Sequence, residues 1–310
     1  MYIGIDIGGM TIKAGLVNDN GEIIAKKTIK TDVGHPEKAI QDIANLCFDT
    51  AKEGNVDFSD VVAIGTGVPG TAHNGVVSFA ANIGWYNVEY AKMLSKLTNK
   101  PCYLGNDANC ALIGEWRFGV AKGYKDVVAI TIGTGVGLAV IVDGKMLLGN
   151  RSAGTEGGHI RIKERGLKCA CGREDCWELY ASTTSLLRRA ETIAIANPDS
   201  IIARLIAEKG LDGFTVFEAD EKGDNEIAKM IDEYIDDIVE GLVNYVNVFR
   251  PELIVLGGGI SKRERIFKPL EEKVNAKAYG GKNNPHVYIK TAKFFNDAGI
   301  IGAAALAMQD

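Results

Sequence analysis

Three cysteines and one histidine gather in one stretch near the middle of the sequence, namely His159, Cys169, Cys171 and Cys176. Three thiolates and one imidazole form a closed tetrahedral ligand set, which is typical of structural zinc. In a chain that we expect to lie in the cytoplasm, clustered cysteines favour metal binding over disulfides. The spacing therefore predicts a structural zinc site, although cysteines that bind no metal would also fit it.

Two carboxylates flank the predicted zinc ligands: Glu156 precedes them and Glu178 follows them. A carboxylate accepts several hydrogen bonds, so it suits the hydroxyl groups of a sugar. Because four protein ligands leave no open position on the metal, the zinc would not bind substrate itself. We expect it to order the loop that carries both carboxylates.

A polar segment, Gly105-Asn106-Asp107-Ala108-Asn109, stands just before a helical pattern that runs through Phe118. Asp107 has two interpretations: it caps the helix, or it accepts the proton of a substrate hydroxyl that attacks a phosphoryl group. A helix N-terminus favours an ionised carboxylate, as that role requires. The amide of Asn106 both donates and accepts, which suits a polyol.

Glycines follow three predicted strands, at Gly8-Gly9, Gly133-Thr134-Gly135-Val136-Gly137 and Gly257-Gly258-Gly259. Glycine lets backbone N–H groups approach phosphate oxygens because it has no Cβ. The first two glycine segments lead into a further strand and not into a helix, which disfavours a dinucleotide-binding fold. The sequence also lacks the P-loop pattern. We predict two hairpin turns, one per domain, that hold a polyphosphate chain across a cleft.

Asp6 stands at the end of the first predicted strand, next to the first glycine turn. A carboxylate there can hold Mg²⁺ through water, since Mg²⁺ keeps much of its hydration shell. Thr11 follows the turn and offers a hydroxyl donor. Each glycine turn alone is equally typical of an ordinary tight β-turn, and the nucleotide interpretation depends on their combination.

The elements that must position these residues occur as a weak internal repeat. Strand, glycine turn, strand, tight turn and strand occupy residues 2–29, and the same succession occupies residues 127–148. This predicts two related domains that each open with a β-meander, although two unrelated hairpins would look similar. Period-3.6 patterns predict helices over 36–52 and 225–249, and a helix of small residues is expected over 297–308.

The composition excludes several classes of function. The formal net charge is −5 and no Lys/Arg-rich block occurs, so nucleic acid and anionic membranes are not expected partners. The sequence has no signal-peptide pattern and no run of 18 apolar residues, so we expect a cytoplasmic location. We expect Cys47, Cys102 and Cys110 to be buried free thiols.

Together these motifs resemble those of the ROK family (repressors, open reading frames and sugar kinases) over essentially the whole chain. Residues 6–9 and 132–137 resemble its two phosphate motifs, and residues 105–109 are similar to its catalytic motif. Residues 154–159, 169–172 and 176–178 resemble its zinc signature, which is the most specific of the motifs. Residues 251–259 resemble its adenosine-side loop.

The resemblance implies an α/β protein with an actin-like (ribonuclease-H-like) ATPase fold and two domains with the sugar in the interdomain cleft. We expect a small N-terminal domain at 1–112, joined by the C-terminal helix 297–310. A larger domain at 113–296 would carry the zinc loop and a dimer surface. The implied activity is ATP-dependent phosphorylation of a hexose at its 6-hydroxyl, with glucose as the expected acceptor. ATP with Mg²⁺, structural Zn²⁺ and a homodimer are implied too.

The resemblance also assigns roles to residues. Asp107 becomes the catalytic base, and His159 both ligates zinc and faces the sugar. The implied sugar-binding residues are Gly70, Asn82, Asn106, Asp107, Glu156, His159 and Glu178. The predicted nucleotide-binding residues are Asp6, Gly8, Gly9, Thr11, Lys13, Gly133, Thr134, Gly135, Gly137, Gly257, Gly258 and Gly259.

The sequence departs from the family at three positions: Met10 replaces a usual Thr, Gly105 a common Glu, and Ala139 a frequent Gly. Other interpretations stay open. A kinase for N-acetylmannosamine, N-acetylglucosamine, allose, fructose or a β-glucoside is the main competitor, and polyphosphate is an alternative donor. A sugar-sensing repressor would need a DNA-binding segment before the first strand, which begins at Tyr2. An actin-like chaperone or filament would not need Asn106-Asp107 or the zinc loop.

Overall fold

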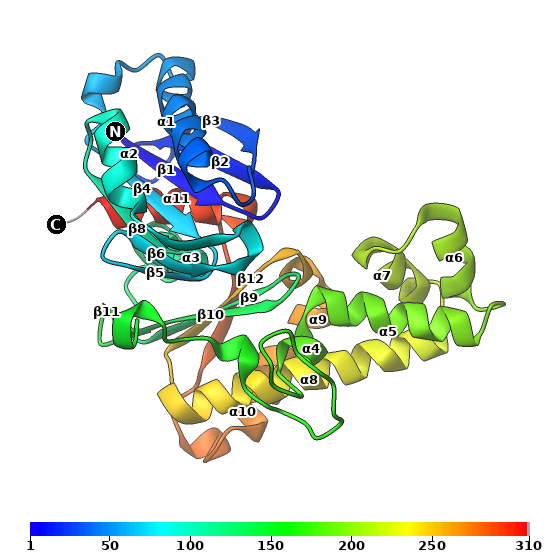
Figure 1. Ribbon diagram of the computed structural model, residues 1–310. Helices are drawn as coiled ribbons and strands as arrows, with labels where there is room; N and C mark the ends of the chain where they lie inside the picture. The colour runs from blue at the N-terminus through cyan, green and yellow to red at the C-terminus, as the bar shows by residue number, and fades with distance from the viewer. Residues whose placement is uncertain (309–310) are drawn as a thin grey trace. The chain divides into compact units, whose positions relative to one another are not determined.

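The computed structural model describes residues 1–308, which form two compact units (Figure 1). Unit 1 contains Met1–Lys125, Ala139–Thr155 and the segment that begins at Ala292. Unit 2 contains Asp126–Leu138 and Glu156–Thr291. The domain ranges expected from the sequence, 1–112 with 297–310 and 113–296, stay a prediction.

Unit 1 contains a five-stranded sheet with the order β3-β2-β1-β4-β8. Its strands are β1 (Tyr2–Ile7), β2 (Thr11–Val17), β3 (Ile23–Lys30), β4 (Ala63–Val68) and β8 (Cys102–Asn106). The first three strands pair antiparallel, whereas β4 pairs parallel with both β1 and β8. The carboxyl ends of β1, β4 and β8 therefore meet at one edge of the sheet, where a binding site is expected in α/β folds.

Helices cover this sheet. They are α1 (Pro36–Glu53), α2 (Tyr90–Thr98), α3 (Asp107–Phe118) and α11 (Ala298–Ala307). The helix predicted over 36–52 is confirmed as α1, whose apolar side chains Ile40, Ile43 and Cys47 are fully buried in the core of this sheet. Cys110 is a buried free thiol as predicted, whereas Cys102 is only partly buried.

Helix α11 packs on the sheet and on α3 through glycines. A Cβ added to Gly65 would lie 1.7 Å from the carbonyl oxygen of Ala303, and one added to Gly302 would lie 1.8 Å from that of Cys110. No side chain fits at those distances, so the backbones touch directly. Figure 1 shows α11, in red, beside β1 and β4.

A three-stranded antiparallel sheet with the order β5-β6-β7 follows β4 in the chain. Its strands are β5 (Thr71–His73), β6 (Val76–Ala80) and β7 (Trp85–Val88). The short 3-10 helix η2 (Ala81–Ile83) connects β6 to β7 and carries Asn82 on the surface. Val77 and Trp85 anchor this sheet in the core.

A second five-stranded sheet has the order β11-β10-β9-β12-β13. Its strands are β9 (Val127–Ile132), β10 (Val136–Val142), β11 (Lys145–Met146), β12 (Leu253–Gly257) and β13 (Tyr288–Thr291). Strand β12 pairs parallel with both β9 and β13. In chain order, the strands of this sheet occupy the same places as those of the first. The repeat predicted from the sequence is thereby confirmed.

Unit 2 also contains helices. They are α4 (Glu178–Ala181), α5 (Thr183–Ala196), α6 (Ile201–Lys209), α7 (Gly213–Glu221), α8 (Asn225–Phe249), α9 (Glu264–Phe267) and α10 (Leu270–Lys277). The long helix predicted over 225–249 is confirmed as α8. The buried indole of Trp177 fits against Gly241 of α8 and donates to the carbonyl of Asp237 at 2.9 Å. This anchor fixes the chain between Cys176 and Glu178.

Short 3-10 helices complete the chain at η1 (Phe58–Asp60), η3 (Asn150–Ser152), η4 (Gly157–His159), η5 (Gly259–Lys262), η6 (Gly281–Asn283) and η7 (Phe295–Asp297). Within residues 1–308, no helix is both long enough and apolar enough to cross a bilayer.

Candidate active site

The helix cap of α3 belongs to Asn106 and not to Asp107. The Asn106 side-chain oxygen accepts from the backbone N–H groups of Ala108 at 2.9 Å and Asn109 at 3.2 Å. Its amide nitrogen donates to the carbonyl of Gly70 at 3.0 Å. The capping interpretation of Asp107 is therefore wrong. Because Asn106 satisfies the cap, Asp107 is the first helical residue, with an exposed carboxylate at the positive end of the helix.

Gly70 is the point where β4 and the small sheet meet this cap. Its φ of 94° lies in the left-handed region, and a Cβ there would lie 2.1 Å from the carbonyl oxygen of Phe79. Only glycine satisfies both constraints. The predicted acceptor residues Gly70, Asn106 and Asp107 are thus neighbours in unit 1. Within residues 1–308, no hydrogen bond joins Asn82 to Gly70 or Asn106.

Asp6 and Asp107 come from strand ends at the same edge of the first sheet. Asp6 on β1 pairs with Gly67 on β4, and Gly67 pairs with Gly105 on β8, two residues before Asp107. A Cβ on Gly67 would lie 3.5 Å from the Cα of Asp107, so β4 has no side chain there to separate the two. The fold therefore gathers two carboxylates around one glycine.

The environment of Asp6 makes its carboxyl less acidic than usual. Burial raises its pKa, and Lys13, 3.7 Å away, lowers it by a smaller amount. A Cβ on Gly299, near the start of α11, would lie 2.5 Å from the Asp6 carboxyl carbon. The Asp6 carboxylate thus rests against the N-terminal turn of α11, where glycine leaves room for it.

The β1–β2 turn is tied to the sheet edge through backbone groups. Gly8 donates from its N–H to the carbonyl of Thr11 at 2.9 Å, and the Thr31 hydroxyl donates to the carbonyl of Gly8 at 2.7 Å. Gly9 is exposed and Met10 is 84% exposed. The turn thus exposes its tip, as a phosphate-binding turn must.

The β9–β10 turn is held in unit 2 by the start of α5. The carbonyl of Gly133 accepts from the N–H of Thr183 at 2.8 Å, and the carbonyl of Thr134 accepts from the hydroxyl of Thr184 at 2.8 Å. Both carbonyl oxygens therefore accept hydrogen bonds from the start of α5, which fixes the orientation of these two peptide groups. Gly137 lies beyond the turn, within β10.

The loop after β12 contacts the end of β9, where the β9–β10 turn begins. Gly258 has a φ of 88°, and a Cβ there would lie 2.0 Å from the carbonyl oxygen of Ile132, the last residue of β9. Gly257 is the last residue of β12, and Gly259 begins η5. The structure therefore brings together two of the three glycine segments in unit 2.

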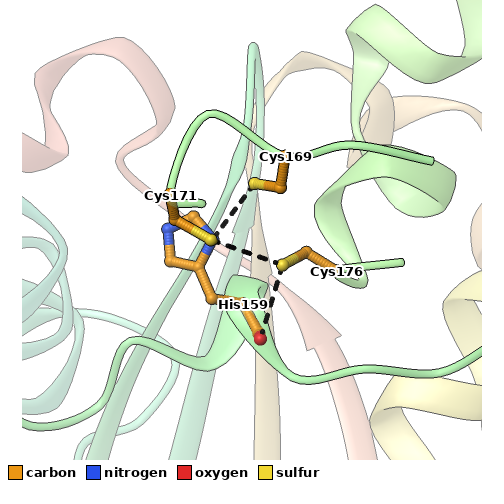
Figure 2. Close-up of side chains that lie close together, drawn as sticks. All are labelled: His159, Cys169, Cys171 and Cys176. Carbon is orange, nitrogen blue, oxygen red and sulfur yellow. Dashed lines mark hydrogen bonds between the residues drawn. The ribbon is translucent and has the colours of Figure 1, made fainter. Parts of the chain in front are cut away.

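The predicted zinc ligands form one cluster. One ligand atom from each of His159, Cys169, Cys171 and Cys176 lies within 4.8 Å of the others. Figure 2 shows the three sulfurs and the imidazole around a common centre. The Sγ atoms of Cys171 and Cys176 are 3.6 Å apart, and Nδ1 of His159 is 3.7 Å from Sγ of Cys169. Thiolates at about 2.3 Å from a tetrahedral zinc lie about 3.8 Å apart, so the cluster fits this ion.

Glu178 links this cluster to the β9–β10 turn. Its Oε1 lies 3.2 Å from Sγ of Cys169 and 3.4 Å from Nδ1 of His159. Its Oε2 would lie 2.6 Å from a Cβ on Gly135. Glu156 is exposed at the start of η4. Three of the predicted residues, Glu178, His159 and Gly135, are therefore neighbours within one unit.

Sequence reasoning missed the group that shapes the zinc loop. The buried Asp175 accepts from the N–H groups of Arg165, Gly166 and Leu167 at 2.9, 2.9 and 3.0 Å, and from the Tyr180 hydroxyl. The Tyr180 hydroxyl and these backbone donors lower the pKa of Asp175 to about 2. The position of Asp175 directly before Cys176 is not a sequence pattern that predicts its burial or its backbone hydrogen bonds. Thr183 and Thr184 were missed as well, although Ser182-Thr183-Thr184 is a helix-start pattern.

Comparison with known proteins assigns the family. A family model described as the ROK family matches residues 2–310. The chain belongs to the ROK family. A glucokinase from Thermotoga maritima is 33% identical over 309 residues, covering 98% of this chain and 96% of the relative. A solved ROK family glucokinase from Streptomyces griseus, in complex with glucose and AMPPNP, has a TM-score of 0.85 and 32% identity, covering 100% of this chain and 99% of that one.

Regulators also occur among the relatives of this ROK protein. A xylose repressor from Caldicellulosiruptor bescii is 28% identical over 315 residues, covering 99% of this chain and 78% of the relative. The predicted actin-like (ribonuclease-H-like) fold is confirmed by the solved ROK structure and by the repeated strand order of the two sheets. The family assignment made from the motifs is confirmed too.

Proposed function

We propose that this ROK protein transfers the γ-phosphoryl group of ATP to the 6-hydroxyl of a hexose, with glucose as the preferred acceptor. The observation that carries the proposal is the pair of carboxylates, Asp6 at the end of β1 and Asp107 directly after β8, at the same edge of one sheet on either side of β4. One carboxylate beside a phosphate turn and one at a helix start are what metal-assisted phosphoryl transfer to a hydroxyl requires. The similarity to two glucokinases supports the same reaction.

Asp107 is the proposed catalytic base. Its exposed carboxylate lies at the N-terminus of α3, where the helix dipole favours negative charge. It accepts the proton of the 6-hydroxyl as that oxygen attacks the γ-phosphorus, and the bond to the β-phosphate oxygen breaks. In a loose transition state, the main effect of the base is to orient the hydroxyl. Asn106 positions Asp107 by capping the helix and holding Gly70.

Asp6 is the proposed residue that holds Mg²⁺. Its carboxylate lies at a strand end, and its ion pair with Lys13 is long at 3.7 Å. Oxygen ligands of this kind fit Mg²⁺, which neutralises charge on the phosphates when bound. The exposed turns at Gly8-Gly9 and Gly133–Gly135 offer the backbone N–H groups for the phosphate oxygens.

We propose that His159, Cys169, Cys171 and Cys176 bind a structural zinc ion. The ligand atoms have the spacing of a tetrahedral site, and zinc supplies local order to the loop. Nδ1 of His159 faces Cys169, which leaves Nε2 as an N–H donor for a sugar hydroxyl. Glu178, held next to the cluster, accepts from a second hydroxyl.

The full sugar set stays a prediction. Its members are Gly70, Asn82, Asn106, Asp107, Glu156, His159 and Glu178. Homodimer formation and a cytoplasmic location remain predictions as well. Size-exclusion chromatography with light scattering tests the homodimer, and a measured mass equal to that of one chain contradicts it.

The deciding experiment is a panel of acceptors with ATP and Mg²⁺, in zinc-replete protein, with ADP release as the measurement. The panel contains glucose, mannose, fructose, allose, N-acetylglucosamine, N-acetylmannosamine and cellobiose. We expect kcat/KM for glucose to exceed every other value at least about tenfold, a difference that a few hydroxyl contacts can produce. Another preferred sugar keeps the mechanism and replaces the acceptor. No turnover with any sugar contradicts the kinase, and repetition with polyphosphate then tests the alternative donor.

Asp107→Asn tests the base. The amide cannot accept a proton, so kcat should fall by at least about 100-fold while glucose binding changes little. Isothermal calorimetry gives the binding constant in the same protein. A variant with a kcat near that of the wild type would remove Asp107 from the mechanism.

A further inference from the structure

Arg263 and Phe214 form a stacked pair at the surface of unit 2. The guanidinium carbon of Arg263 lies 4.5 Å from the ring centroid of Phe214 and 5.0 Å from that of Phe217. Phe217 is buried, whereas Phe214 is 74% exposed. The Arg263 contact thus leaves most of the Phe214 side chain in solvent, next to a planar cation.

The pair follows directly on the glycine loop after β12. Gly258 touches the end of β9, one residue before the Gly133 turn. From there η5 (Gly259–Lys262) leads to Arg263. A 3-10 helix rises about 2.0 Å per residue, so Arg263 lies about 6–8 Å along the chain from Gly259. This is the scale of a nucleoside whose phosphates lie at the glycines.

Neighbouring contacts hold the pair in place. Arg265, in α9, donates to Asp220 of α7 at 3.2 Å and to Asp232 of α8 at 2.7 Å. The Ser261 hydroxyl donates to the carbonyl of Gly258 at 2.7 Å, which fixes the start of η5. The elements that carry Phe214 and Arg263 are therefore tied together before any ligand binds, which lowers the entropic cost of binding.

We propose that the purine base of the nucleotide donor stacks on the Arg263–Phe214 pair. Nucleobases stack on aromatic rings and on the planes of arginine guanidinium groups, which are the two surfaces offered here. The proposal rests on the proposed function, since it assigns the base-binding part of that donor site. It makes Phe214 and Arg263 determinants of the affinity for ATP and not of the affinity for the sugar.

The test is calorimetric binding of AMPPNP and, separately, of tripolyphosphate, which has no base, to the full-length zinc-replete protein. Phe214→Ala should weaken AMPPNP binding about tenfold, the effect expected for one lost base–aromatic stack, and leave tripolyphosphate binding unchanged. Phe214→Leu, which keeps an apolar side chain but no ring, should also weaken AMPPNP. Phe214→Tyr should restore it. Arg263→Lys, which keeps the charge and loses the plane, should weaken it too.

Tyr279→Ala is the matched control, because this aromatic of unit 2 is 82% exposed and lies outside the pair. It should change neither affinity. In steady state, Phe214→Ala should raise KM for ATP and leave kcat and the sugar KM near their wild-type values. The inference is overturned by unchanged AMPPNP affinity in Phe214→Ala, by an equal loss for tripolyphosphate, or by a wild type that binds no AMPPNP. A wild type that binds AMPPNP but phosphorylates no sugar contradicts the proposed function alone.

Discussion

The β1–β2 turn and the β9–β10 turn occupy the same place in two sheets of the same strand order, yet their surroundings differ. The first has a carboxylate beside it, Asp6, which rests against the start of α11. The second has no acidic residue between Val127 and Val142 in the sequence, and Glu178 reaches it from α4. Under the proposed function, the same backbone turn would therefore serve metal binding in one unit and would be coupled through Glu178 to the His159–Cys176 cluster in the other.

The largest expected effect comes from removing the charge of Asp6, the carboxylate that lies beside the β1–β2 turn. Asp6→Asn should lower kcat at least about 100-fold, because it removes the metal-holding carboxylate, as for other essential carboxylates. It should not destabilise the fold. Burial raises the pKa of Asp6, so the folded protein binds a proton more readily than the unfolded chain. Stability therefore falls as pH rises through the raised pKa, and the neutral amide relieves that cost.

Thermal unfolding at neutral pH checks the second half of this prediction. The melting temperature of Asp6→Asn should equal or exceed that of the wild type, and it should depend less on pH on the acid side. A marked fall in melting temperature would mean that Asp6 is a structural residue.

The second effect tests the coupling role of the β9–β10 turn. In Gly135→Ala the new methyl group would lie 2.6 Å from Oε2 of Glu178, so the carboxylate must move. If Glu178 binds the sugar, the loss of one charged hydrogen bond should raise the KM for glucose about tenfold. Gly133→Ala is the control, because a Cβ there has no heavy atom within 4 Å. Equal KM values for the two variants would contradict the coupling.

A third, smaller effect comes from the metal. Cys171→Ser should lower the zinc content measured by atomic emission and raise the KM for glucose several-fold, since the loop that holds Glu178 and His159 loses its order. The core of unit 2 has other anchors, so global unfolding should change less than the KM. Cys47→Ser, at a buried thiol outside the cluster, is the comparison for zinc content. Wild-type protein without zinc would end this part of the proposal.

The smallest effect concerns pH. Lys13 lowers the pKa of Asp6, so Lys13→Met should raise it further. If ionised Asp6 holds the metal, activity is lost as pH falls through this pKa, and the acid limb of kcat/KM should move upward by about half a pH unit. The pH–rate profile of wild type and variant measures this. A downward shift, or no shift, would mean that the acid limb does not report the ionisation of Asp6.

The sequence predicted the strands of the two β-meanders, their repeat and the cluster of one histidine and three cysteines because each depends on local pattern. Alternating apolar residues and glycine turns define the β-meanders, and ligand types with short spacing define the cluster. The helix start after Asn106-Asp107 was predicted correctly, but Asp107 was considered as its cap and not Asn106. Which of them caps α3 depends on the hydrogen bond from Asn106 to Gly70, which lies 36 positions earlier in the chain.

Other features depend on approaches between distant segments, for which the sequence carries no pattern. Asp175 is buried among backbone N–H groups of its own loop, whose path could not be foreseen. The Arg263–Phe214 stack joins residues about one-sixth of the chain apart, and its significance depends on the exposure of the ring. In the sequence Gly299 is one of several small residues in the last predicted helix. Only the fold shows that the Asp6 carboxylate lies against it.

The contact of α11 with Gly65 has a consequence for synthesis on the ribosome. The first sheet, built from residues made early, obtains this covering helix only after residues up to Ala307 have been made. Unit 2 ends at Thr291, so all its segments are available sooner. Domains usually fold in the order of synthesis. Here the unit that contains the N-terminus is completed last. The helix that packs on its glycine-lined sheet face, α11, is among the last segments to be synthesised.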